Sequence, residues 1–285
     1  MMKRRKSLQT TAHIKIIIIV IFIAIIVKVL DYYGSSDSLP EYPGYKREKL
    51  ETIADMKSLY EGNITKEEER QLFLQTGLGE WGIEGIRKES KNMHELEKKL
   101  HYFQKQLFEE KGKKKLTDLQ TGDVLVSMSQ RLFFYPHGHA AIVTDGKENI
   151  LLEARSYHAG SCPCKEDKWA NLSSFIVLRL KKEIRETFKE QKGYDPAQKA
   201  ADYAKENLDG LKYSLFKDLR PLSGSTLEYT QCAHLVWYAY YVSGLDIDEN
   251  RGIIIKPKDF LESDVFEIVQ VFGISPDKLL RMRDE

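Results

Sequence analysis

The longest apolar stretch of the chain lies close to its start. Twelve consecutive apolar residues occupy positions 16–27, and the stretch widens to 14–30 with one lysine near each end. The basic residues 3–6 precede it and no comparable cluster follows, a distribution that keeps the N-terminus in the cytoplasm. We therefore predict that residues 1–30 form a single-pass membrane anchor with the rest of the chain outside the cytoplasm. The alternative is a cleaved signal peptide and a secreted protein.

A polar linker and a helical extension are expected next. Turn-forming residues over 31–48 predict the linker, and the charged segment 49–115 predicts the extension. Thr65 and Glu68 have the spacing of a capping box, and a second helix is expected over 93–109 because apolar residues recur on one face. The glycines expected to interrupt the helical pattern are Gly77, Gly79, Gly82 and Gly85. The extension is interpreted either as a cap that shapes a cleft or as a plain packing unit.

Residues 116–285 have the pattern of a mixed α+β domain. Asp195-Pro196 predicts a helix start, since proline is favoured in the first turn, and residues 231–243 predict a helix that ends at Gly244. We expect an antiparallel sheet packed on this second helix, with loops at 128–138 and 155–172. Apolar runs bounded by turn residues predict strands near 123–127, 139–144, 149–154, 174–180 and 266–272.

Cys232 stands at the head of the helix predicted over 231–243. Apolar residues follow it at helical spacing, and Thr230 or Gln231 would lie at the helix cap. The positive end of a helix dipole favours a thiolate over a thiol. Cys232 is therefore a candidate nucleophile, and the alternative is a buried cysteine that packs as a small apolar residue.

A histidine and a carboxylate upstream of this thiol could complete a catalytic set with it. His139 opens a predicted strand, and antiparallel pairing with the next strand would set Glu153 or a neighbour beside it. Cys232, His139 and Glu153 could then act as nucleophile, general base and orienting carboxylate. If Glu153 instead points to solvent, Asn149 or Tyr157 could orient the histidine.

These motifs, in this order, resemble the circularly permuted branch of the NlpC-type papain-like cysteine hydrolases, the YiiX-like or YaeF-like proteins of bacteria. The resemblance covers about residues 116–272 and implies a papain-like fold, peptide or amide substrates, and catalytic roles for Cys232, His139 and Glu153. Ala233 departs from the family, in which serine often follows the cysteine. The matching segments are Gly122–Leu125, Gly138–Val143, Leu152–Ala154, Gln231–Trp237 and Ile255–Leu261.

Two other histidines compete for the role of base. His137 lies two residues before His139, which is preferred because it directly precedes the strand of small apolar residues, as in the family pattern. His234 follows Cys232 by two residues, and such positions point to different faces of a helix. We therefore expect His234 to be a partly buried packing residue.

Composition narrows the class of function. The 285 residues carry a formal net charge of +1, which gives no global reason to expect nucleic-acid binding. The chain has no glycine-rich phosphate loop and no HExxH motif, so no cofactor or metal is expected.

Cys162 and Cys164 lack a second pair of ligands nearby, which argues against a zinc site. A structural loop role is predicted for them, with a disulfide outside the cell as the alternative.

We therefore expect an exported, membrane-anchored cysteine hydrolase that cleaves amide bonds, with cell-wall peptides such as those of peptidoglycan as the default substrate. Two alternatives stay open. The first is an acyl-lipid amidase, esterase or acyltransferase of the same fold, and the second is a non-catalytic binding or scaffold protein.

Overall fold

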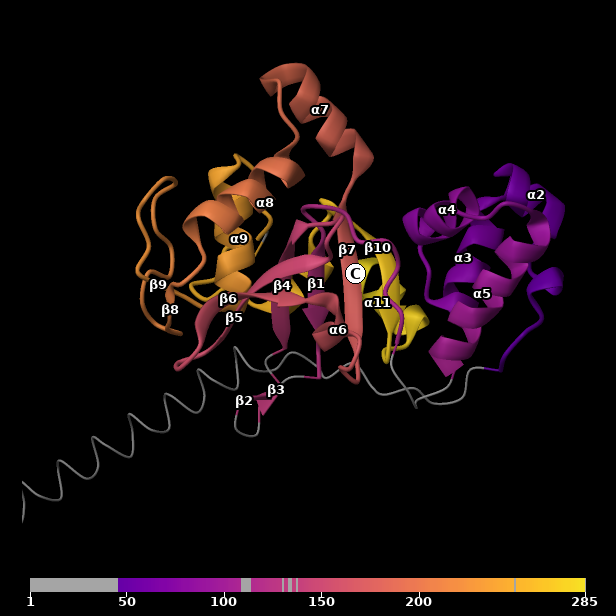
Figure 1. The fold of residues 1–285 in the computed structure, drawn as a ribbon, viewed down its shortest axis with the longest axis horizontal. Helices are drawn as coiled ribbons and strands as arrows, with labels where there is room; N and C mark the ends of the chain where they lie inside the picture. Colours follow the sequence, from indigo (N-terminus) through magenta and orange to yellow (C-terminus); the bar gives the residue numbers. More distant parts are fainter. Residues whose placement is uncertain are drawn as a thin grey trace, which may run out of the picture.

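The computed structural model describes residues 46–108, 114–129, 131–132, 135–136, 138–248 and 250–284. They form an α+β structure in which helices pack around a six-stranded sheet (Figure 1). The elements in chain order are η1 (Leu50–Thr52), α2 (Met56–Glu61), α3 (Lys66–Thr76), α4 (Glu80–Lys88), α5 (Met93–Phe108), β1 (Val124–Ser127), β2 (Arg131–Leu132), β3 (Tyr135–Pro136), β4 (His139–Asp145), β5 (Ile150–Ser156), β6 (Gly160–Lys165), α6 (Glu166–Trp169), β7 (Phe175–Leu180), α7 (Lys182–Lys192), α8 (Pro196–Asn207), β8 (Lys212–Tyr213), β9 (Tyr229–Thr230), α9 (Cys232–Val242), α10 (Pro257–Glu262), β10 (Phe266–Phe272) and α11 (Pro276–Asp284).

One antiparallel sheet is the centre of the structure. Its strands lie in the order β10-β7-β1-β4-β5-β6, and every neighbouring pair is antiparallel. All residues of β1 and β7 are buried, which explains why their sequences are mostly apolar rather than alternating, with Ser127 and Arg179 as the polar exceptions. Ser127, the last residue of β1, lies opposite His139, the first residue of β4. The first residue of β4 is therefore presented at one end of the sheet.

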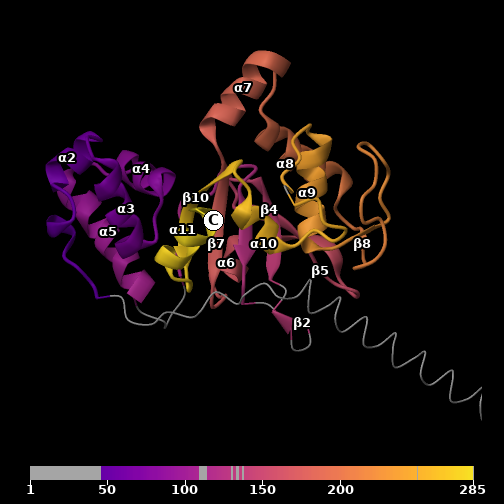
Figure 2. The same cartoon turned by 180° about the vertical axis from the view of Figure 1, so that it is seen from behind.

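The two faces of the sheet belong to different apolar clusters. Val126 and Ile142 belong to the cluster that includes residues of α8 and α9. These two helices lie side by side in both views (Figures 1 and 2). Leu125 and Val143 belong to a second cluster with Trp169 of α6. Because successive residues of a strand point to opposite faces, this alternation fixes which strand residues can face each helix.

The helical extension packs at the β10 edge of the sheet (Figures 1 and 2). Elements η1 and α2 to α5 share an apolar cluster of their own. The predicted capping box is confirmed: the Glu68 amide donates to Thr65 Oγ1 at 3.2 Å, and the Thr65 amide donates to Glu68 Oε2 at 2.7 Å. The helix predicted over 93–109 is α5.

The segment that joins α3 to α4 pairs with the edge strand β10. The Gly79 amide donates to the Val269 carbonyl oxygen at 3.0 Å, and the Val271 amide donates to that of Gly77 at 2.7 Å. A Cβ atom at Gly79 would lie only 1.9 Å from the Ile268 carbonyl oxygen, so only glycine allows this close approach. The pairing covers part of a sheet edge that would otherwise offer open backbone groups.

The prediction that Gly82 and Gly85 interrupt the helical pattern was wrong, because α4 runs through both. The buried side chains of Ile83 and Ile86 join the cluster of the extension. Their packing outweighs the low helix propensity of glycine, which costs about 1 kcal/mol per residue.

The five predicted strands correspond to β1, β4, β5, β7 and β10, and the two predicted helices correspond to α8 and α9. The loop predicted over 155–172 was wrong, since that segment contains β6 and α6. Gly160 and Pro163 make the local sequence a poor strand signal, and β6 forms through its pairing with β5. The predicted loop 128–138 contains the short strands β2 and β3.

The anchor predicted within residues 1–30, and most of the linker predicted over 31–48, lie outside the described residues. Within the described part of the chain, no helix combines the length and the apolar character required to cross a bilayer.

A buried ion pair fixes the start of β1 against β7. Asp123 and Arg179 are 1% and 4% exposed. Arg179 donates from Nε to Asp123 Oδ1 at 2.8 Å and from Nη2 to Oδ2 at 2.7 Å. Gly122, the residue before Asp123, has a φ of +89°. A Cβ atom at Gly122 would lie 2.6 Å from the side chain of Ala197 in α8. The Gly122-Asp123 turn therefore fixes both the ion pair and the approach of α8.

We expect Arg179→Leu to lower the free energy of unfolding by about 3–5 kcal/mol, because it leaves a buried carboxylate without its partner. Urea denaturation followed by circular dichroism measures this loss. Lys182→Gln is the control, since Lys182 and Glu186 form an exposed pair at 3.6 Å whose loss should cost less than about 1 kcal/mol. Similar losses in the two variants would contradict the structural role of the buried pair.

Candidate active site

Cys232 is the first residue of α9 and is 2% exposed. Gln231 is the N-cap, and its Oε1 accepts hydrogen bonds from the Ala233 amide at 3.0 Å and from the Cys232 thiol at 3.4 Å. Apolar residues bury α9 on every side, so the position of its first turn is closely determined. The thiol is therefore held at a helix start, where unpaired amide groups and the helix dipole favour negative charge.

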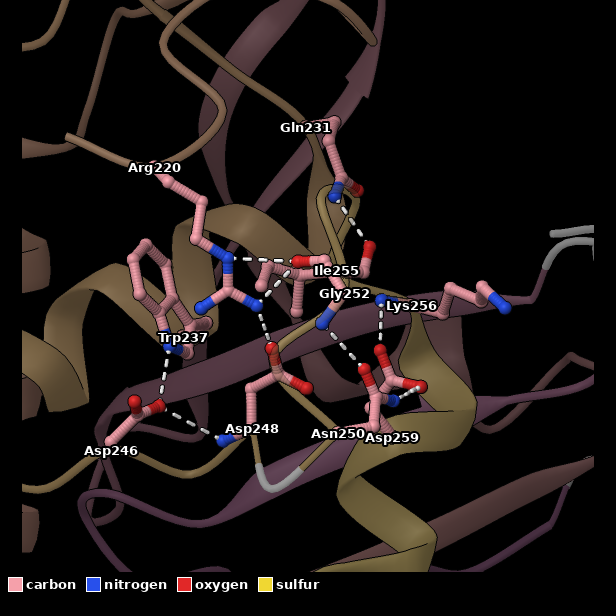
Figure 3. Close-up of polar contacts among 10 residues, drawn as sticks. All are labelled: Arg220, Gln231, Trp237, Asp246, Asp248, Asn250, Gly252, Ile255, Lys256 and Asp259. Carbon is pink, nitrogen blue, oxygen red and sulfur yellow. Dashed lines mark hydrogen bonds and ion pairs between the residues drawn. The ribbon is translucent and has the colours of Figure 1, made fainter. Parts of the chain in front are cut away.

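Gln231 is itself held by the loop that follows α9 (Figure 3). Its Nε2 donates to the Ile255 carbonyl oxygen at 2.8 Å. Arg220 fixes the same loop, because its Nε donates to the Gly252 carbonyl oxygen at 2.8 Å and its Nη2 contacts the Asp248 carboxylate. The segment that carries the thiol is thus tied on both sides of α9.

Asp259 of α10 completes this network (Figure 3). It accepts hydrogen bonds from the Lys256 amide and from Asn250 Nδ2, each at 2.7 Å. Burial raises the pKa of Asp259 to about 6. Because Lys256 directly follows Ile255, Asp259 also fixes the carbonyl group that holds Gln231.

His139 reaches the site from the end of the sheet. Gly138 before it has a φ of +72°, a conformation that residues with side chains rarely adopt. A Cβ at Gly138 would also lie 3.0 Å from the Ser127 carbonyl oxygen and 3.2 Å from Pro257. Glycine therefore allows the chain to turn tightly into β4 and to present the imidazole from its first residue.

The His139 imidazole contacts both of the other residues predicted for this site. Its Nε2 lies 2.8 Å from Glu153 Oε2, and the ring also forms a hydrogen bond with the Cys232 side chain. Since Nε2 faces the carboxylate, Nδ1 is the nitrogen that remains for the thiol. Burial lowers the pKa of His139, but the hydrogen bonds with Cys232 and Glu153 outweigh it and raise the pKa to about 9.

Glu153 is fully buried and does not point to solvent. The register of the β4–β5 pair sets it diagonally across from His139 on the same face. Its second oxygen, Oε1, contacts Arg155 Nε and Lys168 Nζ. Burial alone would raise the pKa of this carboxyl, but its bonds to His139, Lys168 and Arg155 hold that pKa well below its usual range.

The short helix α6 lies against this pair of residues and was missed in the sequence. Trp169 stacks on the His139 ring with centroids 5.4 Å apart and planes 14° apart. Lys168, the preceding residue, contacts Glu153. No periodicity in a four-residue helix could have revealed either contact.

Tyr213 lies near the thiol, and Tyr157 packs on Tyr213. Burial, followed by the charges of Cys232 and Tyr157, raises the pKa of Tyr213. Tyr157 is 63% exposed and meets the Tyr213 ring edge-on at 5.2 Å. Tyr157 and Asn149 were the alternative residues to orient His139. Tyr157 packs on Tyr213 and Asn149 lies in the β4–β5 turn. The residue that bonds the imidazole is Glu153.

His234 lies apart from this arrangement. It is buried, and its Nδ1 lies 3.0 Å from Thr230 Oγ1. Its ring stacks on Tyr238 with centroids 6.0 Å apart, and burial lowers its pKa to about 4. His234 is more deeply buried than predicted. Because its pKa is about 4, its ring is neutral near neutral pH, and it acts as a packing residue. His137 lies outside the described residues.

Cys162 and Cys164 lie on β6 rather than in the predicted loop, and both are free thiols. Cys162 pairs with Glu153 across the β5–β6 ladder. Burial and then the Glu153 charge raise the pKa of Cys164 to about 12, so it stays protonated. Cys164 therefore lacks the environment of a reactive cysteine.

Two other features of the described residues lie away from Cys232. Ligand atoms of Glu51, Glu97 and His101 in the extension lie within 4.8 Å of one another, although Glu51 is exposed. A cavity of about 840 Å³ lies between the extension and residues 114–120, and its lining includes Glu166 and Asp167 of α6 but none of Cys232, His139 and Glu153.

No protein-family model, curated protein or solved structure matches this chain. The interpretation of the site therefore depends on its geometry and chemistry.

The pKa of Asp259 predicts a pH dependence of stability. Between the ordinary pKa of an aspartate and about 6, the folded protein keeps a proton that the unfolded chain has lost. The stabilising contribution of this carboxyl is therefore complete at low pH and is lost as the pH rises through about 6. Asp259→Asn cannot ionise, so from about pH 4 to pH 7 it should gain roughly 2–3 kcal/mol relative to the wild type.

Urea unfolding at each pH measures this difference. The exposed Asp202 provides the control, because Asp202→Asn should track the wild type at every pH. A difference between Asp259→Asn and the wild type that does not change with pH would contradict the assignment.

Proposed function

We propose that this protein is a cysteine hydrolase of the circularly permuted NlpC-type papain-like family. The observation that supports this most is the single imidazole that bonds a thiol at a helix start and a buried carboxylate. Nucleophile, base and orienting group in mutual contact are the arrangement that thiol-dependent acyl transfer requires. The order of His139, Glu153 and Cys232 along the chain agrees with the permuted branch.

Cys232 and His139 would form the reactive pair. With its pKa raised to about 9, the His139 ring keeps its proton through neutral pH and can pair with a Cys232 thiolate. The thiolate attacks the carbonyl carbon, and His139 then donates its proton to the leaving amine as the C–N bond breaks. Water, deprotonated by His139, next attacks the thioester. This step releases the carboxylic acid and restores the thiol.

The start of α9 would stabilise the oxyanion. The Cys232 amide belongs to the first turn, whose N–H groups have no acceptor within the helix. Gln231 is engaged at both ends of its amide, by Ala233 and by Ile255, so it holds the helix start rather than contacting substrate. The backbone amide is therefore the oxyanion donor that we assign.

We propose that the enzyme is exported and held at the membrane by the apolar stretch at 14–30, with the catalytic residues outside the cytoplasm. Cell-wall peptides are the substrate class that such a position offers to an amide-cleaving enzyme. The basis for the location is the distribution of apolar and basic residues before position 31.

Variants at the three residues should lose activity in a graded order. Cys232→Ala should abolish hydrolysis, and His139→Ala should lower turnover by roughly 10²–10⁴-fold because general-base assistance is lost. Glu153→Gln should have a smaller effect, since its amide oxygen can still accept from the imidazole but carries no charge. The measurement is release of products from purified cell-wall peptides, with a panel of acyl lipids in parallel.

Cys162→Ala, Cys164→Ala and His137→Ala are the controls and should keep most of the turnover. Alkylation of Cys232 by iodoacetamide, followed by mass spectrometry, gives a readout that needs no substrate, and it should slow in His139→Ala near neutral pH. Wild-type turnover in Cys232→Ala would refute the nucleophile. Cleavage of lipids alone would exclude the peptide substrate.

The location has its own test. Protease added to intact cells stripped of their wall should degrade the body of the protein, because the N-terminal stretch places it outside. A cytoplasmic protein must stay intact in the same sample. Protection of both proteins would overturn the location and the cell-wall substrate that follows from it.

A further inference from the structure

We propose that α6 is a positioning element of this site, in which Lys168 balances the charge of the buried Glu153 carboxylate and Trp169 fixes the plane of the His139 ring. This inference rests on the proposed function, because it concerns the same thiol and imidazole. Two neighbouring residues of one four-residue helix contact two different members of the site.

The two oxygens of Glu153 are divided between different partners. Oε2 meets His139 at 2.8 Å, and Oε1 meets both Arg155 and Lys168. Arg155 comes from the same strand as Glu153, two residues further along. Lys168 comes from a separate element, so its contact depends on where α6 lies. A lone carboxylate buried this deeply would favour its neutral form, which could not support an imidazolium.

The position of α6 is well defined by its packing. Trp169 is fully buried in the cluster that also holds Ala141 and Leu151, the strand neighbours of His139 and Glu153. Its nearly parallel stacking on the imidazole limits rotation of the ring away from Glu153. Trp169 therefore acts through His139.

The charges around the site determine the direction of the expected effect. Arg155 and Lys168 face Glu153 as cations, Cys162 and Cys164 lie on the adjacent strand, and Cys232 faces the imidazole from α9. Removal of one cation makes every nearby proton harder to lose. Formation of the thiolate and loss of the imidazolium proton should therefore both move to higher pH.

Lys168→Gln provides the test, because the amide can still donate to Glu153 Oε1 but carries no charge. The rate of Cys232 alkylation and the rate of turnover, each measured against pH, should shift upward by about one pH unit, the size of effect that a neighbouring charge produces. Lys168→Arg should restore the wild-type profile. Lys165→Gln is the matched control, since Lys165 donates to the Glu148 carbonyl oxygen at 3.0 Å and should leave the profile unchanged.

An unshifted profile in Lys168→Gln, or an equal shift in Lys165→Gln, would overturn the proposal. If Lys168→Gln does not fold, Lys168→Met removes the same charge at the same position of α6 and must give the same upward shift. Failure of the proposed function gives a different result. Cys232 would then be alkylated at the same rate with histidine or alanine at position 139, both in the wild type and in Lys168→Gln.

Discussion

The chemistry of this site depends on a carboxylate that stays ionised inside the protein. Glu153 is fully buried, and removal of its charge from water alone would favour the neutral acid. Its partners reverse that preference: one oxygen meets the His139 imidazole and the other meets two cations. The same negative charge helps the buried imidazole to keep its proton, against a desolvation that acts in the opposite direction. Without this charge one of the two hydrogen bonds that raise the pKa of His139 would lose its strength, and burial would favour the neutral ring.

The fold brings these groups together from four separate elements. The β4–β5 register sets Glu153 and His139 on one face, while α9 packs on the other, so the imidazole at the end of β4 is placed to meet both the carboxylate and the thiol. Gly138 makes this possible because its φ of +72° lets the chain turn directly into the first residue of the strand. The loop network around Arg220 and Asp259 holds Gln231, and through it the first turn of α9 (Figure 3).

The strands, the two helices of the core and the contact between His139 and Glu153 could be predicted because each has a local signal, whereas the approach of Cys232 to His139 was implied only by the family resemblance. Apolar runs between turn residues marked the strands, and hairpin geometry placed the carboxylate near the histidine. The roles of Lys168 and Trp169 could not be predicted, since α6 is too short for periodicity and its contacts arise only when β6 pairs with β5. Gly77 and Gly79 do interrupt the helical pattern, as predicted, between α3 and α4. The sequence alone could not show that an edge strand approaches Gly79 so closely that a Cβ atom would not fit. Residues 1–45 and His137 lie outside the described residues, so the anchor and the competing histidine stay predictions.

The most direct test of this account is the titration of the His139 imidazole by nuclear magnetic resonance, with isotope-labelled histidine and the signal assigned through His139→Ala. In the wild type the ring should lose its proton with a pKa of about 9. In Cys232→Ala the pKa of the ring should fall, because one of the two hydrogen bonds that raise it is gone. A His139 ring that titrates near its ordinary pKa in both proteins would contradict the proposed ion pair and the cysteine hydrolase that depends on it.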